Sequence, residues 1–246
     1  PGEYRPCTFD RPPAGVPTVS EDRSSNRMLA ALSEGDGLPW SDQLQAVELP
    51  AGHELHASGA APSHVHFPTT ALVALMQPTH GSDEICVALV GNDGVLGVAA
   101  LLGVLAESSR AVVLHPGAFW RLPVGALTVD GPEPLRTTQV VLGHLESLTA
   151  QMAQTALCQR THTVEQRLGR WLLMAFDRLP CDALAMDLGD LSVHLKVPAE
   201  ALAGAAAQLV DMGAMAFEPG RMRLLDRQAL TAHACDCASR VRLPTG

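Results

Sequence analysis

The stretch from Pro132 to Leu179 reads PEPLRTTQVVLGHLESLTAQMAQTALCQRTHTVEQRLGRWLLMAFDRL and decides how the rest of the chain is organised. Pro132 and Pro134 lie at its start. A proline is tolerated in the first turn of a helix, because the backbone amide it lacks would have no hydrogen-bond partner within the helix there. Apolar residues then recur at three- and four-residue spacings, which predicts a helix: Leu135, Val141, Leu142, Leu145, Leu148, Met152 and Ala156. About 25 residues at ~1.5 Å rise form a rod of about 40 Å.

A rod of this length in a modest chain usually lies between domains or pairs with its own copy. The near-heptad spacing of Leu142, Leu145 and Met152 favours a left-handed helix pair. We therefore predict a dimerisation helix over residues 133–160. Its expected interface consists of Leu135, Leu142, Leu145, Leu148 and Met152. A long core helix within one domain is the alternative, because a seam of two heptads is a short pattern.

A second helix is predicted directly after the rod. The sequence Thr163-Val-Glu-Gln166 has the form of a capping box. In such a box the first and the last side chain accept hydrogen bonds from backbone amides at the start of the helix. An apolar face follows, with three arginines largely off it and Pro180 expected to stop the helix. The face consists of Leu168, Trp171, Leu172, Ala175 and Leu179, and the arginines are Arg167, Arg170 and Arg178.

Composition indicates a globular protein of one or two domains. The 246 residues are 47% hydrophobic, their mean hydropathy is +0.12, and no apolar run reaches the ~18–20 residues of a membrane span. Residues 1–25 are rich in Pro and Ser and are expected to form a disordered arm. We expect a cytoplasmic protein. We do not expect an enzyme, because no Ser/His/Asp order, lysine-bearing glycine loop or paired-carboxylate motif stands out.

The charge balance does not by itself predict a nucleic-acid binder. The net charge is −9, with one lysine against sixteen arginines. A dimer can nevertheless present a local basic patch.

Cysteines and histidines give weak metal signals. Six cysteines lie at positions 7, 86, 158, 181, 235 and 237, and only Cys235 and Cys237 are close in sequence. One close pair with this spacing is a weak zinc signal, so free thiols and no metal site are expected. Imidazoles at His53, His56, His64 and His66 suit zinc, copper or haem iron, but no cysteine or carboxylate completes a set nearby. We expect them to be exposed or packed, and metal or haem binding there stays open.

The two ends of the chain predict different folds. Before the rod, residues 26–32 form a short helix, and strand-like runs separated by Gly/Pro turns indicate an all-β sandwich or barrel. After the second helix, residues 187–195 and 199–212 read as two helices joined by a short turn. A hairpin over residues 214–225 and a helix capped by Asp226 complete a winged helix-turn-helix.

The order of these elements resembles that of the Crp/Fnr superfamily of bacterial transcription regulators. The segments LPAGHELHASGAAPSHVHFPTTALVALM, LVGNDGVLGVAALLG and SSRAVVLHPGAFWRLP look like its cyclic-nucleotide-binding β-roll, and THTVEQRLGRWLLMAFDRL is similar to its first DNA-domain helix. The resemblance covers residues 26–240. It implies an α+β protein with a jelly-roll-like, double-stranded β-roll sensor over 26–132, the dimerisation helix, and a winged helix-turn-helix domain over 161–240.

The resemblance implies an effector pocket that departs from the family pattern. Nucleotide-binding members carry a Glu in the loop written here Gly94-Val-Leu-Gly97, and an Arg-Ser pair later. This chain has Val95 and Ser109-Arg110 instead. Standard cAMP binding is therefore not expected, and the effector is unknown. The expected pocket consists of Gly94, Val95, Leu96, Ser109, Arg110, Leu145 and Thr149.

The second helix of the helix-turn-helix is also degenerate. Of the side chains by which the family reads DNA, only Glu200 survives, beside Ala199, Ala203 and Gly204. We expect contacts to DNA from Lys196, Glu200, Arg221, Arg223, Arg167 and Arg170. Two hypotheses follow. The first is a homodimeric regulator with weak or altered DNA readout; the second is a Crp/Fnr-like protein without sequence-specific DNA binding that acts through protein partners.

Overall fold

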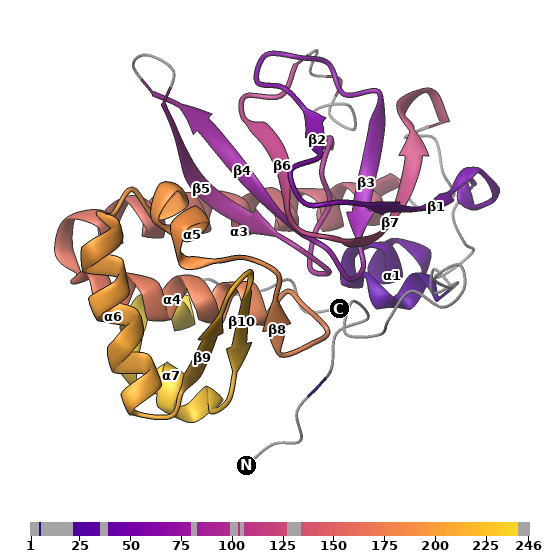
Figure 1. The fold of residues 1–246 in the computed structure, drawn as a ribbon. Helices are drawn as coiled ribbons and strands as arrows, with labels where there is room; N and C mark the ends of the chain where they lie inside the picture. Colours follow the sequence, from indigo (N-terminus) through magenta and orange to yellow (C-terminus); the bar gives the residue numbers. More distant parts are fainter. Residues whose placement is uncertain are drawn as a thin grey trace.

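The computed structural model describes residues 5, 22–34, 39–79, 83–98, 103, 106–126 and 134–240. A strand-rich domain and a helix-rich domain lie against each other, and a long helix extends from one to the other (Figure 1). Among the described helices, none combines the length and apolarity that crossing a membrane requires. Most of the predicted arm, residues 1–25, lies outside the described residues. Arg5 is described, and both its backbone and its guanidinium bond to Asp182.

The amino-terminal domain is the predicted β-roll, preceded by one helix. The helix α1 (Arg27–Ser33) is capped by the Asn26 side chain, which accepts from Leu29 N at 2.8 Å. One sheet has the order β1-β7-β3 and the other β2-β6-β4-β5, and all neighbouring strands are antiparallel. The strands are β1 (Gln45–Leu49), β2 (Glu54–His56), β3 (His64–Pro68), β4 (Leu72–Pro78), β5 (Glu84–Val90), β6 (Arg110–His115) and β7 (Gly117–Pro123). The strand-like runs between the Gly/Pro turns of the sequence span residues 46–49, 53–56, 65–67, 72–77, 84–90, 111–114 and 118–122. The strands lie within one residue of these runs, so the turn signals located them correctly.

The four-stranded sheet is buried on both faces. Alternate residues along a strand point to opposite faces. Those on one face fill the interior of the roll, among them Val73, Leu75, Ala111 and Val113. Those on the other face belong to one continuous apolar core with the carboxyl-terminal domain, among them Leu72, Ala74, Met76, Val112 and Leu114. The two domains are therefore packed together through this sheet.

The predicted rod is a single helix. Helix α3 (Pro134–Thr161) has 28 residues, about 42 Å at the usual rise. Its inner face packs on the roll, where the Gln151 side chain bonds both backbone groups of Leu89, at 2.7 Å to the amide and 3.1 Å to the carbonyl. The 3₁₀ segments η2 (Arg23–Ser25), η3 (Ser41–Gln43) and η4 (Val124–Ala126) flank the roll.

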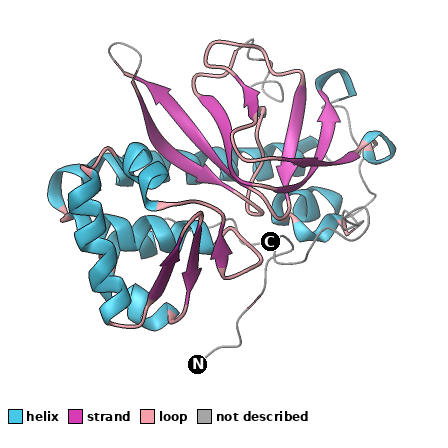
Figure 2. Cartoon of the chain, viewed as in Figure 1, coloured by secondary structure: helices cyan, strands magenta, loops and turns pink. Residues whose placement is uncertain are grey.

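The carboxyl-terminal domain has the predicted winged helix-turn-helix order, which Figure 2 shows as helices around a small sheet. Its sheet has the order β8-β10-β9, and the short strand β8 was not predicted. The elements are α4 (Val164–Phe176), β8 (Ala183–Leu184), α5 (Leu188–Leu195), α6 (Ala199–Asp211), β9 (Met215–Glu218), β10 (Arg221–Leu224), α7 (Arg227–His233) and η5 (Asp236–Arg240).

Helix α4 confirms one prediction and corrects another. The Thr163–Gln166 capping box is present. The helix ends at Phe176, however, and not at Pro180 as predicted, with Asp177 as its C-cap. Directly after this C-cap, the Arg178 side chain turns into the protein interior and is only 2% exposed. The chain therefore does not continue as a helix to Pro180.

Candidate functional site

The helix-turn-helix pair α5 and α6 is built by two backbone devices. Asp187 caps α5 by accepting from Asp190 N at 3.1 Å. Lys196 ends α5 in the left-handed region, at φ 50°, a conformation that only a few per cent of non-glycine residues adopt. Val197 is buried in the domain core, and α6 begins at Ala199. The tight turn thus orients α6 on the outside of the domain.

The exposed face of α6 offers little to a DNA base. Leu202, Ala205, Ala206 and Leu209 face the core, whereas Glu200, Ala203 and Gly204 are exposed. The sequence of the helix contains no Lys or Arg. Glu200 therefore lies where a base contact was predicted, without a cation beside it on the helix.

The predicted DNA-contacting cations have very different surroundings. Lys196 is exposed and lies 3.5 Å from Asp83. Arg223 in the wing is bound to Glu218 at 2.8 Å, and Arg221 on the same strand is half-buried. Arg167 is half-buried and donates to the Leu195 carbonyl at 2.6 Å.

Arg170 departs from its predicted role. Its side chain is buried, with only 5% of the residue exposed, and burial lowers its pKa from the ordinary arginine value. Its Nη1 donates to Thr155 Oγ1 at 3.3 Å. The Arg170 guanidinium cannot contact a phosphate of the DNA backbone from this position. The face of α4 that carries it is turned toward the end of α3. Arg170 is therefore not a DNA contact in this structure.

A pocket of about 300 Å³ lies between the roll and α3. Five of the seven predicted effector residues line it: Val95, Leu96, Ser109, Leu145 and Thr149. Gly94 does not, because its Cα faces the buried ring of His144, where an added Cβ would lie 2.4 Å from Cε1. The remaining lining includes His56, Leu75, Glu107, Leu148 and Met152.

Arg110 also lies outside the pocket lining. It forms an ion pair with Glu84, where Nε donates at 2.9 Å, and it lies 3.5 Å from Glu54. Its neighbour Ser109 is buried and faces the pocket. Successive strand residues point to opposite faces. The inverted Ser-Arg order therefore puts Ser109 on the pocket side and Arg110 on the opposite side.

The four histidines of the roll do not form a metal-binding group among the described residues. His64 and His66 lie side by side, with ring centroids 6.0 Å apart. His66 is buried against Phe119, and burial lowers its pKa to about 3. Burial likewise lowers the pKa of His56. The rings of His56 and His66 are therefore neutral, packed groups at ordinary pH.

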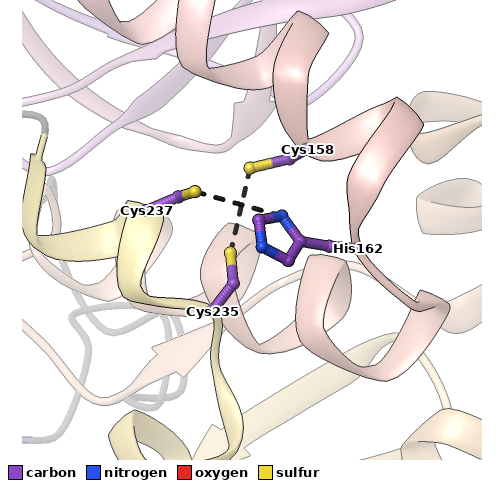
Figure 3. Close-up of side chains that lie close together, drawn as sticks. All are labelled: Cys158, His162, Cys235 and Cys237. Carbon is purple, nitrogen blue, oxygen red and sulfur yellow. Dashed lines mark hydrogen bonds between the residues drawn. The ribbon is translucent and has the colours of Figure 1, made fainter.

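The cysteines depart most from the sequence-based prediction. Cys158 and His162, at the end of α3, lie beside Cys235 and Cys237, which follow α7 (Figure 3). Their ligand atoms are all within 4.8 Å of one another. Burial raises the pKa of the Cys235 thiol to about 12. Only the Cys235/Cys237 pair gave a sequence signal, since 73 positions separate His162 from Cys235.

The expectation of free thiols holds at four described cysteines and is wrong at a fifth. Cys86, Cys158, Cys235 and Cys237 are free. Cys181 is disulfide-bonded to a sulfur outside the described residues. Asp182, the residue after Cys181, is bonded to Arg5.

The predicted dimer face is partly exposed in the single chain. Leu142 is 54% exposed, whereas Leu145, Leu148 and Met152 are half-buried against the roll. Leu135 belongs to α3, but its side chain is outside the described residues. Leu157, which was not predicted, is also 54% exposed. Two leucines of α3, Leu142 and Leu157, are thus exposed in the single chain.

Solved structures of other proteins share this architecture. FixK2 from Bradyrhizobium japonicum matches with a TM-score of 0.65 at 15% identity, covering 78% of this chain and 98% of that one. TTHB099, a CRP-family transcriptional regulator from Thermus thermophilus, matches with a TM-score of 0.62 at 16% identity, covering 80% and 100%. The chain has the Crp/Fnr fold.

Other Crp/Fnr structures match over similar lengths. CLP from Xanthomonas campestris, described as a global regulator responsive to c-di-GMP, matches with a TM-score of 0.58 at 11% identity, covering 83% of this chain and 100% of that one. No family model matches the sequence, and no curated protein matches it significantly. The Crp/Fnr likeness is therefore one of fold.

Proposed function

We propose that this chain is a Crp/Fnr-type transcription regulator that works as a homodimer and binds DNA through its winged helix with altered readout. The observation that carries the proposal is the complete order of roll, 28-residue helix and winged helix-turn-helix in one chain. In this proposal helix α3 pairs with its copy in a second chain, and each chain then presents one helix α6 and one wing.

The charges on this surface point to readout dominated by the wing. Arg221 and Arg223 lie on β10, whereas α6 contributes only Glu200 of the predicted contacts. Phosphate contacts supply most of the non-specific affinity for DNA, so few cations mean weak, salt-sensitive binding. Without an arginine–guanine pair, about 1–3 kcal/mol of discrimination is missing from each half-site.

A gel shift tests the proposal directly. The full chain at micromolar concentration should retard random duplex DNA at low salt. Replacing Arg221 and Arg223 by Ala should abolish the shift, whereas replacing Arg121 on β7 and Arg136 on α3 by Ala should not. Absence of any shift at micromolar protein would remove the DNA-binding function. Unchanged binding by the wing variant would exclude the wing as the contact.

The roll pocket favours an effector without a phosphate. Its lining is mostly apolar, its polar groups include Ser109, Thr149 and Glu107, and no Lys or Arg is among the described lining residues. A phosphate there would face Glu107 with no cation to balance it. Mass spectrometry of the natively purified protein should find a neutral small molecule or none. Thermal stabilisation by cAMP would contradict this assignment.

The second candidate function is action through a protein partner, without DNA readout. It is favoured by the apolar groups exposed around α6, where Val193, Val210 and Met212 are 59%, 47% and 41% exposed. A chain that fails the gel shift but captures a defined partner through this surface would support it. Loss of that capture in a Val210→Glu variant would locate the contact.

A further inference from the structure

The end of α3 and the segment after α7 bring four metal-ligating side chains to one point. Cys158 and His162 are four residues apart, and this spacing puts them on the same face of a helix. Cys235 and Cys237 are presented at the start of η5. The four side chains converge from two directions on a shared centre (Figure 3).

We propose that Cys158, His162, Cys235 and Cys237 form a zinc site that fastens the winged-helix domain to the end of the dimerisation helix. The proposal does not depend on DNA binding or on an effector. It concerns a site that neither the sequence patterns nor the fold predicts.

The distances fit one tetrahedral ion. A zinc–sulfur bond of about 2.3 Å implies a sulfur–sulfur separation of about 3.8 Å across a tetrahedron. The Sγ atoms of Cys158 and Cys235 are 3.8 Å apart, and Cys237 Sγ is 3.9 Å from His162 Nδ1. A disulfide requires about 2.05 Å between sulfurs, so this arrangement is not a cystine.

The ligand set is that of a closed structural zinc site. Three cysteines and one histidine are a common combination for structural zinc, and they leave no position open for a substrate. Sulfur ligands disfavour magnesium and calcium, which prefer oxygen. Cys158, Cys235 and Cys237 are 2%, 4% and 7% exposed, and His162 is half-buried. The metal would therefore enter past His162.

A second layer of contacts supports the ligands. Gln154 Nε2 donates to Cys237 Sγ at 2.7 Å. Such outer contacts orient the ligands and tune the metal. On the opposite chain segment, an added Cβ on Gly169 would lie 3.1 Å from Ala234 Cα. Glycine at this position lets α4 approach the backbone directly before Cys235.

The buried Arg170 supplies an independent argument. Its Nε and Nη2 have no hydrogen-bond partner among the described residues, although the residue is only 5% exposed. The guanidinium interacts electrostatically with Cys158, Cys235 and Cys237. Three thiolates and one Zn²⁺ carry a net charge of −1, which this cation would balance. The site thus explains why an arginine is buried here.

The position of the site gives it a structural role. Helix α3 ends at Thr161 and α4 begins at Val164, so His162 lies in the joint between them. A metal bound to both His162 and the segment after α7 would fix the winged-helix domain relative to α3. When Zn²⁺ binds, the three thiols release their protons to solvent.

The test is metal analysis of the full chain, expressed with added zinc and purified with reductant and without chelator. About one zinc per chain is expected. Replacing zinc by Co²⁺ should give the visible absorption of a tetrahedral cobalt–thiolate centre. Cys158→Ser and His162→Gln should lower zinc to background. Cys86→Ser, a buried free thiol outside the cluster, should keep about one zinc per chain.

Stability and charge provide further readouts. A zinc chelator should lower the Tm of the wild-type chain and leave that of the His162→Gln variant unchanged. His162 is half-buried, so this variant is the one expected to keep its fold. The Arg170→Met variant should bind zinc about 10–100-fold more weakly, as outer-layer changes do.

Several outcomes would overturn the proposal. One is a folded, reduced wild-type chain that takes up neither zinc nor cobalt. Another is full zinc content in the His162→Gln and Cys158→Ser variants. Copper or iron bound in place of zinc would refute the choice of metal. A disulfide between Cys158 and Cys235 that persists in the chain purified with added zinc and reductant would refute the site.

Discussion

Arg178 and Asp93 form a buried ion pair that joins the winged-helix domain to the β-roll. Arg178 Nε lies 3.1 Å from Asp93 Oδ2, and the two side chains are 2% and 7% exposed. Arg178 also donates to the carbonyls of Leu89, at 3.1 Å, and Met174, at 2.9 Å. The close approach needs Gly91, where an added Cβ would lie 2.6 Å from Arg178 Cβ and from its carbonyl oxygen.

Breaking this pair should be costly. An Asp93→Asn substitution leaves the buried guanidinium without its counter-charge, which costs about 3–5 kcal/mol of unfolding free energy. Glu84→Gln, in the more exposed Arg110–Glu84 pair, should cost less than about 1 kcal/mol. Urea denaturation of both variants measures the difference. Equal losses would mean that burial does not distinguish the two pairs.

Gln151 should contribute to stability through Leu89. A Gln151→Leu substitution removes the acceptor of the buried Leu89 amide, and an unsatisfied buried group costs about 1–3 kcal/mol. Hydrogen exchange should show faster exchange at that amide. The exposed Gln159→Leu substitution on the same helix should change stability by no more than about 0.5 kcal/mol. An unchanged Leu89 exchange rate in the Gln151 variant would contradict the role given to this side chain.

Two glycine-to-alanine substitutions should have opposite effects. At Gly94 the new Cβ meets the His144 ring at 2.4 Å, and overpacking of this kind costs about 1–3 kcal/mol. At Gly204, on the exposed face of α6, nothing lies within 4 Å, so Ala should stabilise the helix by about 0.5–1 kcal/mol. Thermal denaturation of the two variants measures whether each substitution lowers or raises the Tm. A stabilised Gly94→Ala variant would show that His144 moves aside freely.

Stability should fall as the pH drops below about 6.5. Burial lowers the pKa of His115 to about 4 and that of His66 to about 3, from 6.5. The unfolded chain therefore binds protons that the folded chain does not, and stability is lost as pH falls from about 6.5 toward these values. Each histidine should contribute a slope of about 1.4 kcal/mol per pH unit.

The contribution of His115 can be isolated. Its Nδ1 accepts from the Ala185 amide at 2.9 Å, which connects the roll to the winged-helix domain. His115→Asn retains an acceptor and removes the titration, so the slope between about pH 6 and 5 should decrease by about 1.4 kcal/mol per pH unit. Denaturant titrations at these two pH values measure it. A slope equal to that of the wild type would mean that His115 is not the titrating group.

The proposed dimer can be tested at Leu142. Leu142→Glu places a charge on the exposed face of α3 and should shift the chain toward monomer in sedimentation experiments. Leu225 is 52% exposed on the winged-helix domain, close to the 54% of Leu142. Leu225→Glu should therefore leave the oligomeric state unchanged. A Leu142→Glu variant that sediments as the wild type does would remove α3 from the interface.

The sequence alone determined the order and kind of the elements. Apolar periodicity located α3, Gly/Pro turns located the strands, and the Thr163–Gln166 box located the start of α4. These are local signals, because hydrogen bonds within a few residues fix helix ends and turns. The order of elements also carried the resemblance to the fold that the solved structures share.

Only the tertiary structure decided which distant side chains meet. Periodicity placed Arg170 and Arg178 off the apolar face of α4, yet both are buried, because the roll and the segment after α7 pack against that side of the helix. The approach of Cys235 and Cys237 to Cys158 and His162 likewise depends on how the last segment folds back on α3. Contacts across about 70 or more residues arise from packing of the whole chain, which no local pattern specifies.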